Sequence, residues 1–333
     1  MRKRGQIMNI KDTKYTVDAT LKDGSNLDVT PAVQSLQWQA PAEEIAQRAT
    51  IVLAQTKTKK GLLHSLLPLC TLIVIKANGT EVFRGVVWEW EYSSGSAQTI
   101  TLTCYDHFIY AQRSKSFSYY AAGKGTKDII SDLCSKNGIK LDYKYESIKH
   151  AKIVYRSNAI SDQILDTLDE AKRQLKTAPV ALFDKQTLII RPKGQNKDVY
   201  VFKAAKNAVQ TAERMTLDKL VTKVVVMGKE DKAGRRKIEA TVTGDTKYGA
   251  LQEVVYRDGD DTIAAAKAEA QKIIDERGKP DHIISAEAPD VPFIQKGDKV
   301  KMAAGSLVGY YYVKGVTHSA HDRIMTMELE LTA

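Results

Sequence analysis

The sequence predicts an α+β protein that is mainly β, in which two antiparallel β-barrel domains flank a smaller α/β domain. Two observations carry this prediction. Residues 1–112 and 206–333 contain many short runs in which apolar and polar side chains alternate, and this period of two is typical of strands. Residues 113–205 instead space their apolar side chains by three and four, which is typical of amphipathic helices.

Length and composition are consistent with this division. A chain of 333 residues is long enough for two or three domains with cores of their own. Its 43% hydrophobic and 27% charged residues are usual for a globular protein, so disorder is not expected. We expect an N-terminal barrel over residues 1–112, an α/β insert over 113–205, and a second barrel over 206–333 with one helix at about 262–277.

The first segment contains a strong hairpin signal. Asn78-Gly79 lies between two strand-like runs, and this dipeptide is typical of a two-residue hairpin turn. The strand-like runs of this segment are residues 29–38, 49–53, 71–75, 82–88 and 99–105. Several short strands at this spacing predict a barrel or a sandwich.

The middle segment predicts two helices and a hairpin. Thr126 is expected to cap a helix that ends before Gly138, and Ser161 is expected to cap a second helix. Residues 180–183 and 188–190 then read as two strands joined through Asp184-Lys185-Gln186.

The third segment returns to strands. Residues 222–226 and 237–242 are expected to pair around Gly234. Asp261 is expected to cap the helix at 262–277, and Gly278 is expected to end it. The last three strand-like runs are residues 299–302, 310–313 and 325–331.

The first and third segments share a weak internal repeat. In each, a hairpin leads into a Gly-Val pair (Gly85-Val86 and Gly315-Val316) and then into an alternating strand. The spacings differ by several residues, and unrelated antiparallel meanders share such a pattern, so both interpretations remain open. A true duplication would place two copies of one barrel in each chain.

The three cysteines predict no metal or disulfide framework. Cys70, Cys104 and Cys134 are odd in number and have no CxxC spacing. They fall in apolar runs, so we expect buried free thiols in a reducing compartment. A zinc site is disfavoured, because no Cys or His pair has the usual ligand spacing.

The formal net charge of +10 leaves two interpretations. It suits a polyanionic partner, such as nucleic acid or a membrane surface, and it equally suits a basic solvated surface. Only residues 2–4 and 235–237 form short basic runs, so we favour the solvated surface and expect no specific nucleic-acid partner. The most apolar region, residues 62–75, is too short to span a bilayer. We therefore expect no stable membrane insertion.

The sequence offers no catalytic constellation, so we assign no catalytic, cofactor-binding or metal-binding residue and expect no cofactor. The histidines are His64, His107, His150, His282, His318 and His321. His318 and His321 have a helical ligand spacing but lie between predicted strands, so a loop or strand-end role is expected. Cys104 and His107 are also three apart, and Cys104 is expected in the core.

Two further patterns are weak. Residues 123–126 (GKGT) precede a helix but lack the first glycine of a phosphate-binding loop. The adjacent carboxylates Glu43-Glu44 and Asp260-Asp261 are expected to stay solvated on loops, because glycoside hydrolysis needs two carboxyl groups facing each other across a cleft.

Short motifs that match a known family in sequence and in order are spread along nearly the whole chain. They are residues 82–87 (VFRGVV), 101–110 (TLTCYDHFIY), 125–130, 136–139 (KNGI), 183–190, 222–228 (TKVVVMG), 248–253 (YGALQE), 297–300 (GDKV) and 312–318 (YVKGVTH). This set resembles the baseplate hub proteins of contractile phage tails, especially the PBSX-type hubs of defective phages and tailocins. It is also similar to the late-control tail proteins.

The resemblance implies a homotrimer with two tail-tube-like barrels in each chain, so that six barrels surround a channel. Such a trimer is a symmetry adapter between the six-fold tail tube and the three-fold spike. The implied partners are the tail tube protein, the central spike protein, the tape-measure protein and other baseplate proteins. The implied location is the virion or tailocin tail, assembled in the bacterial cytoplasm.

The resemblance also implies that the chain is not an enzyme. Some relatives carry a fused lysozyme or peptidase domain, and no such domain is recognisable here. The alternative is a tail-tip enzyme that degrades peptidoglycan.

Overall fold

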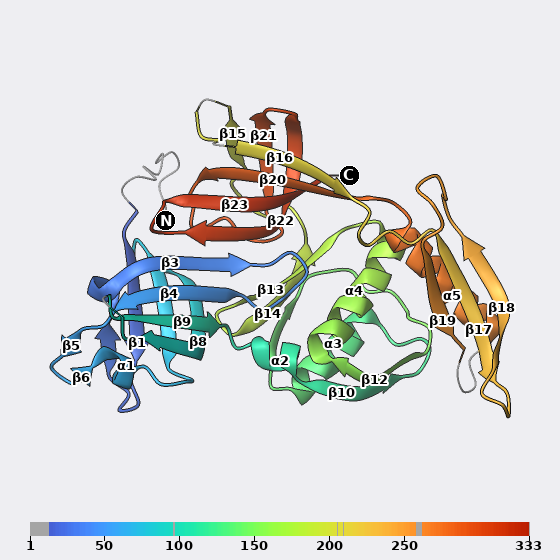
Figure 1. Cartoon of the computed structure of the whole chain (residues 1–333), viewed down its shortest axis with the longest axis horizontal. Helices are drawn as coiled ribbons and strands as arrows, with labels where there is room; N and C mark the ends of the chain where they lie inside the picture. The colour runs from blue at the N-terminus through green and yellow to red at the C-terminus, as the bar shows by residue number, and fades with distance from the viewer. Residues whose placement is uncertain (1–12, 96, 205, 209, 258–261, 333) are drawn as a thin grey trace. The chain divides into compact units, whose positions relative to one another are not determined.

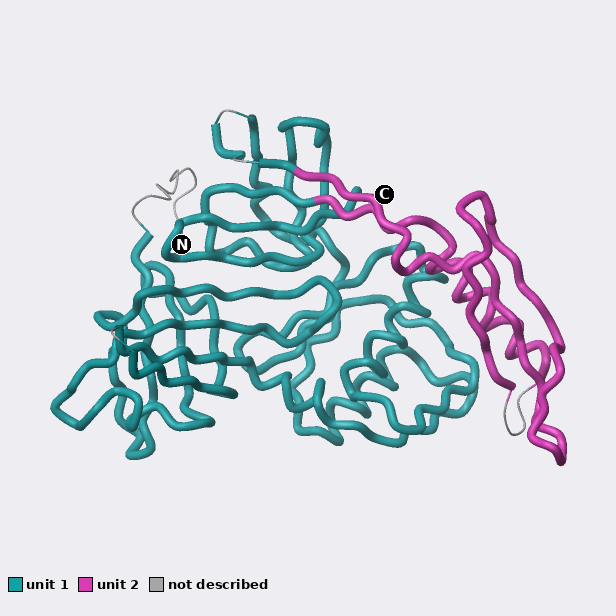
Figure 2. The backbone as a smooth tube through the Cα atoms, viewed as in Figure 1, with its two compact units in different colours: residues 1–211, 285–333 teal, residues 212–284 magenta. Residues whose placement is uncertain are grey.

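The computed structural model describes residues 13–95, 97–204, 206–208, 210–257 and 262–332. The chain forms two compact units, residues 1–211 with 285–333 and residues 212–284 (Figure 2). None of the described helices is long and apolar enough to cross a membrane. The division into three domains at residues 112 and 205 remains a prediction.

The first β segment is an antiparallel meander with one buried face. Its main strands are β1 (Tyr15–Thr20), β2 (Asn26–Asp28), β3 (Val33–Ala40), β4 (Arg48–Ala54), β7 (Leu72–Ala77), β8 (Thr80–Ser93) and β9 (Thr99–Tyr105), in the order β3-β4-β9-β8-β7-β1-β2 (Figure 1). Alternate side chains such as Ile51, Ile73 and Leu102 are fully buried. The short elements are η2 (Thr30–Ala32), β5 (Lys57–Thr58), β6 (Gly61–Leu62) and α1 (Leu63–Leu66).

The predicted Asn-Gly hairpin is confirmed. β7 and β8 pair antiparallel up to Ala77 opposite Thr80, which leaves Asn78 and Gly79 as a two-residue turn. Both have a positive φ, 49° and 76°. That is the backbone conformation for which Asn and Gly are favoured.

The middle segment packs helices against small sheets. It contains α2 (Ile109–Arg113), β10 (Lys115–Tyr120), α3 (Thr126–Lys136), β11 (Lys140–Tyr143), β12 (Ile153–Ala159), α4 (Ile160–Leu175), β13 (Pro179–Asp184) and β14 (Thr187–Pro192). β10 pairs with β12, and β11, β14 and β13 form a second sheet. Ile129 of α3, Ile164 of α4 and Leu188 of β14 belong to one buried core.

Both predicted helix caps in this segment were wrong. Gly125, not Thr126, is the N-cap of α3, and its backbone N–H donates to Asp128. The Thr126 hydroxyl instead contacts Nε2 of the buried His150 at 2.8 Å. Ser161 lies inside α4, because β12 ends at Ala159 and the helix begins at the next residue without a loop. The expected end of α3 is confirmed by Gly138, which has a φ of 65°.

The third segment continues the large sheet of the first. Its strands are β15 (Tyr200–Lys203), β16 (Gln210–Thr216), β20 (Asp281–Pro289), β21 (Lys299–Ala304), β22 (Leu307–Ser319) and β23 (Ile324–Leu331). Their order is β16-β20-β23-β22, and β21 joins β22 to the parallel strand β15. The last residues of β22 pair with β3, from Val316 opposite Ala40 to Ser319 opposite Gln37.

One 13-stranded sheet therefore joins the main strands of the first segment to β15, β16 and β20–β23. The predicted α+β, mainly β class is confirmed. Among the described strands, the main order is an open path whose two ends do not pair with each other. The division of these strands into two tail-tube-like barrels stays a prediction.

The second unit is a small α/β layer. β17 (Lys223–Glu230) lies between β18 (Arg236–Thr243) and β19 (Gln252–Tyr256). Helix α5 (Ile263–Arg277) packs on them, with Ala266 and Ala270 in the same core as Val224 and Val226. The pairing of β17 with β18 around Gly234 and the end of α5 at Gly278 are confirmed. Thr262 caps α5 by accepting the N–H of Ala265, while the predicted cap Asp261 lies outside the described residues.

Candidate functional site: buried junctions and an open strand edge

The histidines singled out from the sequence do not converge on one site. His318 is the penultimate residue of β22 and His321 lies in the turn that follows, as expected for strand-end residues. His150 is buried beside α3, and His282 pairs with Glu213 in the second unit. In the described part of the chain, no group of three or more His, Cys, Asp or Glu side chains is placed to hold a metal ion.

The backbone N–H groups around the loop at residues 123–126 donate hydrogen bonds to other residues of the same chain. The N–H of Gly123 donates to the carbonyl of His150 at 2.8 Å, and that of Thr126 donates to Ile148 at 3.1 Å. The N–H of Lys127 reaches the Ser147 hydroxyl at 3.2 Å. The donors that an anion would need at this helix start are therefore engaged by the chain itself.

The paired carboxylates also have local roles. The Glu44 carboxylate accepts from the Gln112 amide at 2.6 Å, and its backbone carbonyl accepts from the buried Lys296 ammonium at 2.8 Å. Burial lowers the pKa of Lys296 to about 8. Asp260 and Asp261 lie outside the described residues.

Two of the three cysteines are buried thiols, as predicted. Cys104 lies in the core of the first segment and Cys134 in that of the middle segment. Burial raises the pKa of each thiol to about 12. The prediction for Cys70 was wrong, because this residue is exposed in a turn with a φ of 65°. The apolar run around it forms the short helix α1 and a turn before β7 begins.

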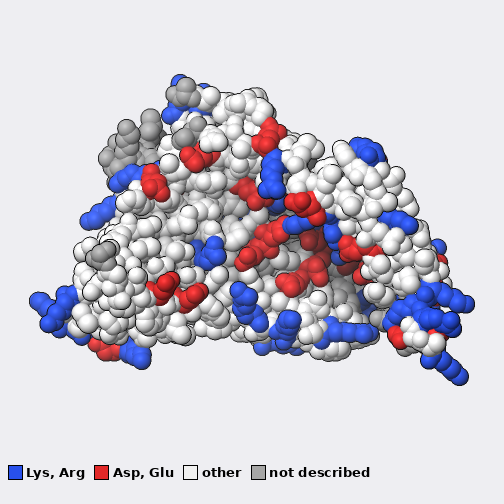
Figure 3. All heavy atoms as spheres, viewed as in Figure 1, with Lys and Arg blue, Asp and Glu red and all other residues white. Residues whose placement is uncertain are grey.

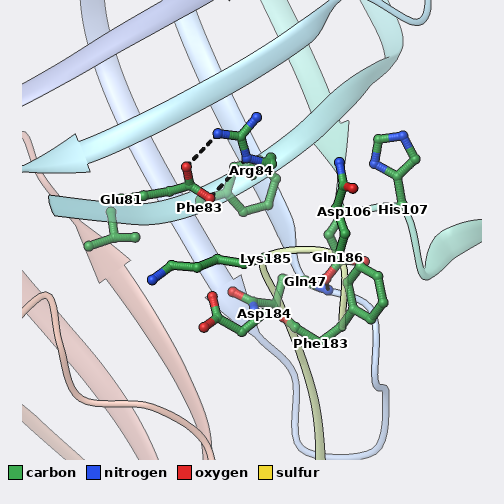
Figure 4. Close-up of a pocket in the computed structure, with 11 residues that line it drawn as sticks. Gln47, Glu81, Phe83, Arg84, Asp106, His107, Phe183, Asp184, Lys185 and Gln186 are labelled. Atoms are coloured by element: carbon green, nitrogen blue, oxygen red, sulfur yellow. Dashed lines mark hydrogen bonds and ion pairs between the residues drawn. The ribbon is translucent and has the colours of Figure 1, made fainter. Parts of the chain in front are cut away.

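A small pocket marks the junction between the first β segment and the β13–β14 hairpin. Figure 4 shows hairpin residues 183–186 facing Glu81, Phe83 and Arg84 of β8. The cavity measures about 10 Å³, which is room for about one water molecule and no substrate. Arg84 pairs with Glu81 at 2.6 Å rather than pointing to an open site.

The polar groups of this junction hold the two segments together. The Gln47 amide donates to the Phe183 carbonyl at 2.6 Å, and the Phe108 and Phe183 rings lie 5.5 Å apart. Asp106 accepts the backbone N–H groups of Gln47 and Phe108 at 2.8 and 2.9 Å. Its burial raises the pKa of this carboxyl to about 8. The two backbone hydrogen bonds give this carboxyl a structural role at the junction.

A second buried cluster lies where β22 meets β3. The His318 ring stacks on Trp38 at 4.6 Å, with 10° between the ring planes. Nδ1 of His318 lies 2.6 Å from the Asp290 carboxylate, and Nε2 lies 3.2 Å from the carbonyl of Ile294. Both neighbours of the ring nitrogens are oxygen atoms that can accept a hydrogen bond. Tyr15 donates to the same carboxylate, which ties β1 into the junction.

The second half of β8 is an open edge that the sequence did not reveal. β7 pairs with β8 only as far as Val86, while β9 continues beside β8 to Ser93. Trp88 and Trp90 are 36% and 39% exposed, and Glu89 and Glu91 between and beside them are exposed too. Trp88 packs edge-on against Tyr105 and Tyr110 of the same chain. The alternation of Trp and Glu at 88–91 is the sequence signal that marks this edge, since a large aromatic side chain such as Trp90 is seldom this exposed.

The fold was compared with known proteins. Three solved structures are similar over most of their length. The 43 kDa tail protein of prophage MuSo2 from Shewanella oneidensis has a TM-score of 0.66 and 13% identity, and the match covers 96% of this chain and 98% of that chain. The tail protein from Neisseria meningitidis MC58 has a TM-score of 0.66 and 12% identity, with 95% and 96% of the two chains covered, and prophage tail protein gp18 from Listeria monocytogenes EGD-e has a TM-score of 0.54 and 13% identity, with 96% of each chain covered. A comparison with curated protein sequences gave no match.

These structures define the fold of the chain. It has the fold of phage tail proteins, and the predicted resemblance to such proteins is confirmed at this level. The family model described as YQBQ-like matches residues 37–332. The chain belongs to the YQBQ-like family.

Proposed function

We propose that this chain is the structural baseplate hub of a contractile phage-like tail. In this role it forms a homotrimer that adapts the six-fold tail tube to the three-fold spike. The observation that supports the proposal is the presence of two β segments in each chain, because three chains then supply six β modules to one ring. Closed rings built from heterologous contacts suit such an adapter.

The partners in this proposal are the tail tube protein on one side and the central spike protein on the other. The tape-measure protein and other baseplate proteins complete the set, and the place of action is the tail of the virion or tailocin. On the face seen in Figure 3, Lys and Arg side chains gather at the lower right and otherwise lie in small groups with Asp and Glu among them.

The hub acts in this proposal through strand pairing and packing, not through bond chemistry. The open edge of β8 supports strand pairing, because β9 continues beside β8 beyond the last residue that β7 pairs. Purified chain should therefore clear no zone in a peptidoglycan zymogram. Clearing that disappears when His107 is replaced by Ala would instead favour the tail-tip hydrolase.

The mass of the chain in solution tests the hub proposal. Analytical ultracentrifugation at increasing concentration should show a species of three times the 37.0 kDa chain mass. A chain that stays monomeric at the highest concentration, and that is also absent from rings in isolated tails, would contradict the proposal.

A further inference from the structure

The two β segments share one strand arrangement, which goes beyond the short motifs of the sequence. In the first, the hairpin β7–β8 is followed by β9, and β8 pairs with β7 over its first half only. In the third, the hairpin β21–β22 is followed by β23, and β22 pairs with β21 over its first half only. Each long strand has a register shift near its middle, between Val87 and Glu89 in β8 and between Val313 and Gly315 in β22.

When the two register shifts are matched to each other, the second halves of the two long strands can be aligned residue by residue. Glu89 corresponds to Gly315, so Trp90 corresponds to Val316 and Tyr92 to His318. In the third segment this half-strand has a neighbour on each side, because β23 pairs with one edge and β3 with the other. In the first segment, β9 pairs with one edge. Among the described strands, none pairs with the other edge beyond Val87.

Burial differs between Trp90 and the corresponding Val316 in the way that a missing strand would produce, whereas Tyr92 is partly buried and stacks on His64. Val316 and His318 are 4% and 2% exposed, because β3 covers them. Trp90 lies opposite the buried Leu102 and therefore on the core side of its sheet, yet it is 39% exposed. A large apolar side chain that faces the core side and remains uncovered indicates a surface that awaits a partner.

The same correspondence identifies the strand that is missing. Beyond β9 the first segment continues with β4 and then β3, and beyond β23 the third segment continues with β20 and then β16. β16 therefore occupies the place of β3. It has one strand neighbour, β20, in the described sheet, and most of its residues are exposed. Met215 in it is 67% exposed.

Charge complements this match. Glu89 and Glu91 project from the β8 edge, and in the described part of the chain no ion pair is formed by either. β16 carries Glu213, which is engaged by His282 at 2.9 Å, and Arg214, whose link to Asp218 is long (3.6 Å) and solvent-exposed. Arg214 is therefore the side chain that complements the acidic β8 edge. Opposite charges on facing strands favour pairing, and equal charges oppose it.

We propose that the second half of β8 in one copy of this chain pairs antiparallel with β16 of a second copy. This contact repeats between chains the β22–β3 pairing that occurs within each chain. It rests on the proposed trimer, in which three such contacts close the ring. Strand addition to an open edge supplies the backbone hydrogen bonds, and the aromatic and charged side chains set the register.

Disulfide trapping tests the contact directly. In a Cys70→Ser background, four variants each combine Glu91→Cys with one cysteine in β16, at position 213, 214, 215 or 216. If the two strands pair, at least one of these four positions lies within disulfide reach of the thiol at position 91 of the neighbouring copy. The matched control combines Glu91→Cys with Lys237→Cys, another exposed strand residue, in β18. Oxidised trimer should show covalent dimer and trimer bands for a β16 position and none for the control.

Charge reversal gives a second measurement that needs no new cysteine. Glu89→Lys with Glu91→Lys should weaken trimer formation at least about tenfold, the equivalent of 1.4 kcal/mol. Adding Arg214→Glu should restore part of this loss. The control places the same charge change at two exposed acids elsewhere, Glu146→Lys with Glu269→Lys, and should leave the trimer unchanged.

The outcomes separate this inference from the hub proposal. A trimer that forms without cross-links at any β16 position, and that tolerates the charge reversal, overturns the β8–β16 contact and leaves the hub proposal standing. A chain that never forms a trimer overturns both. Cross-links to a tail partner protein instead of a second copy would assign the β8 edge to that partner and also overturn the inference.

Discussion

At the residue scale, the turn of the β13–β14 hairpin is occupied by residues that its backbone does not favour. Lys185 and Gln186 have φ of 45° and 65°, the region in which Asn and Gly are preferred. The sequence predicted the hairpin but not this conformation, because Lys and Gln give no signal for it.

Replacing Gln186 by Gly should therefore stabilise the protein. Relief of the left-handed conformation is worth roughly 1 kcal/mol, and the greater freedom of Gly in the unfolded chain offsets part of it. Urea denaturation should show a net gain of about 0.5 kcal/mol. Gln186→Ala is the control and should show no gain. A glycine variant less stable than the alanine variant would contradict this account of the turn.

The buried Asp106 predicts a pH dependence of stability. Its pKa is raised in the folded protein to about 8, whereas an exposed Asp has a pKa of about 3.9. The folded state thus holds its proton more tightly than the unfolded state, so the stability contributed by Asp106 falls as the pH rises from about 4 to about 8.

Asp106→Asn removes this titration. The fall in unfolding free energy between pH 4 and 8 should become shallower in the variant, by up to about 1.4 kcal/mol per pH unit. Chemical denaturation at a series of pH values measures it, and Asp142→Asn at a half-exposed site provides the control. Parallel pH profiles for Asp106→Asn and the unmodified chain would show that Asp106 does not titrate in this window.

The sequence did not predict the roles of side chains that contact residues far away along the chain. His318 and Asp290 are 28 residues apart, and Trp38 is some 280 residues from His318, yet the three form one buried cluster. Thr126 likewise looked like a helix cap, but its hydroxyl bonds to His150. Local capping rules do not include such a competing partner.

At the element scale, the strands and helices were largely predictable because their signals are local. The Asn78-Gly79 hairpin, the hairpin around Gly234 and helix α5 are where the alternation and turn residues indicated. The length of β8 was missed. The strand was expected over residues 82–88 but extends to Ser93. The alternation of Trp and Glu at 88–91 is the local signal for this extension.

Close packing inside β8 predicts a strong effect of one added methyl group. A Cβ on Gly85 would lie 2.3 Å from the carbonyl oxygen of Tyr105 in β9, and backbone cannot move aside as a flexible side chain can. Gly85→Ala should lower the unfolding free energy by about 2 kcal/mol or more. Gly95→Ala is the matched control, because its Cβ would have one neighbour at 3.9 Å.

Thermal or chemical denaturation of the two variants measures the difference. Equal stability of Gly85→Ala and Gly95→Ala would mean that β8 and β9 are not packed as closely as the structure shows.

At the scale of the whole molecule, the fold class was predictable and the joining of the segments was not. The ordered motifs indicated a phage tail protein, and the chain has the fold of such proteins. The pairing of β22 with β3 joins residues some 280 positions apart, and no short-range pattern specifies such a register. Sequence periodicity assigns side chains to a face of a strand but does not state which strand lies next to it.

In the proposed hub, the two β segments of each chain give a three-chain ring with six β modules. Electron cryo-microscopy of the purified chain at high concentration can reveal this ring. We expect a closed ring of three chains in which the β8 edge of each chain contacts β16 of the next. A particle with one chain, or a three-chain ring in which the first and third segments do not alternate around the channel, would contradict it.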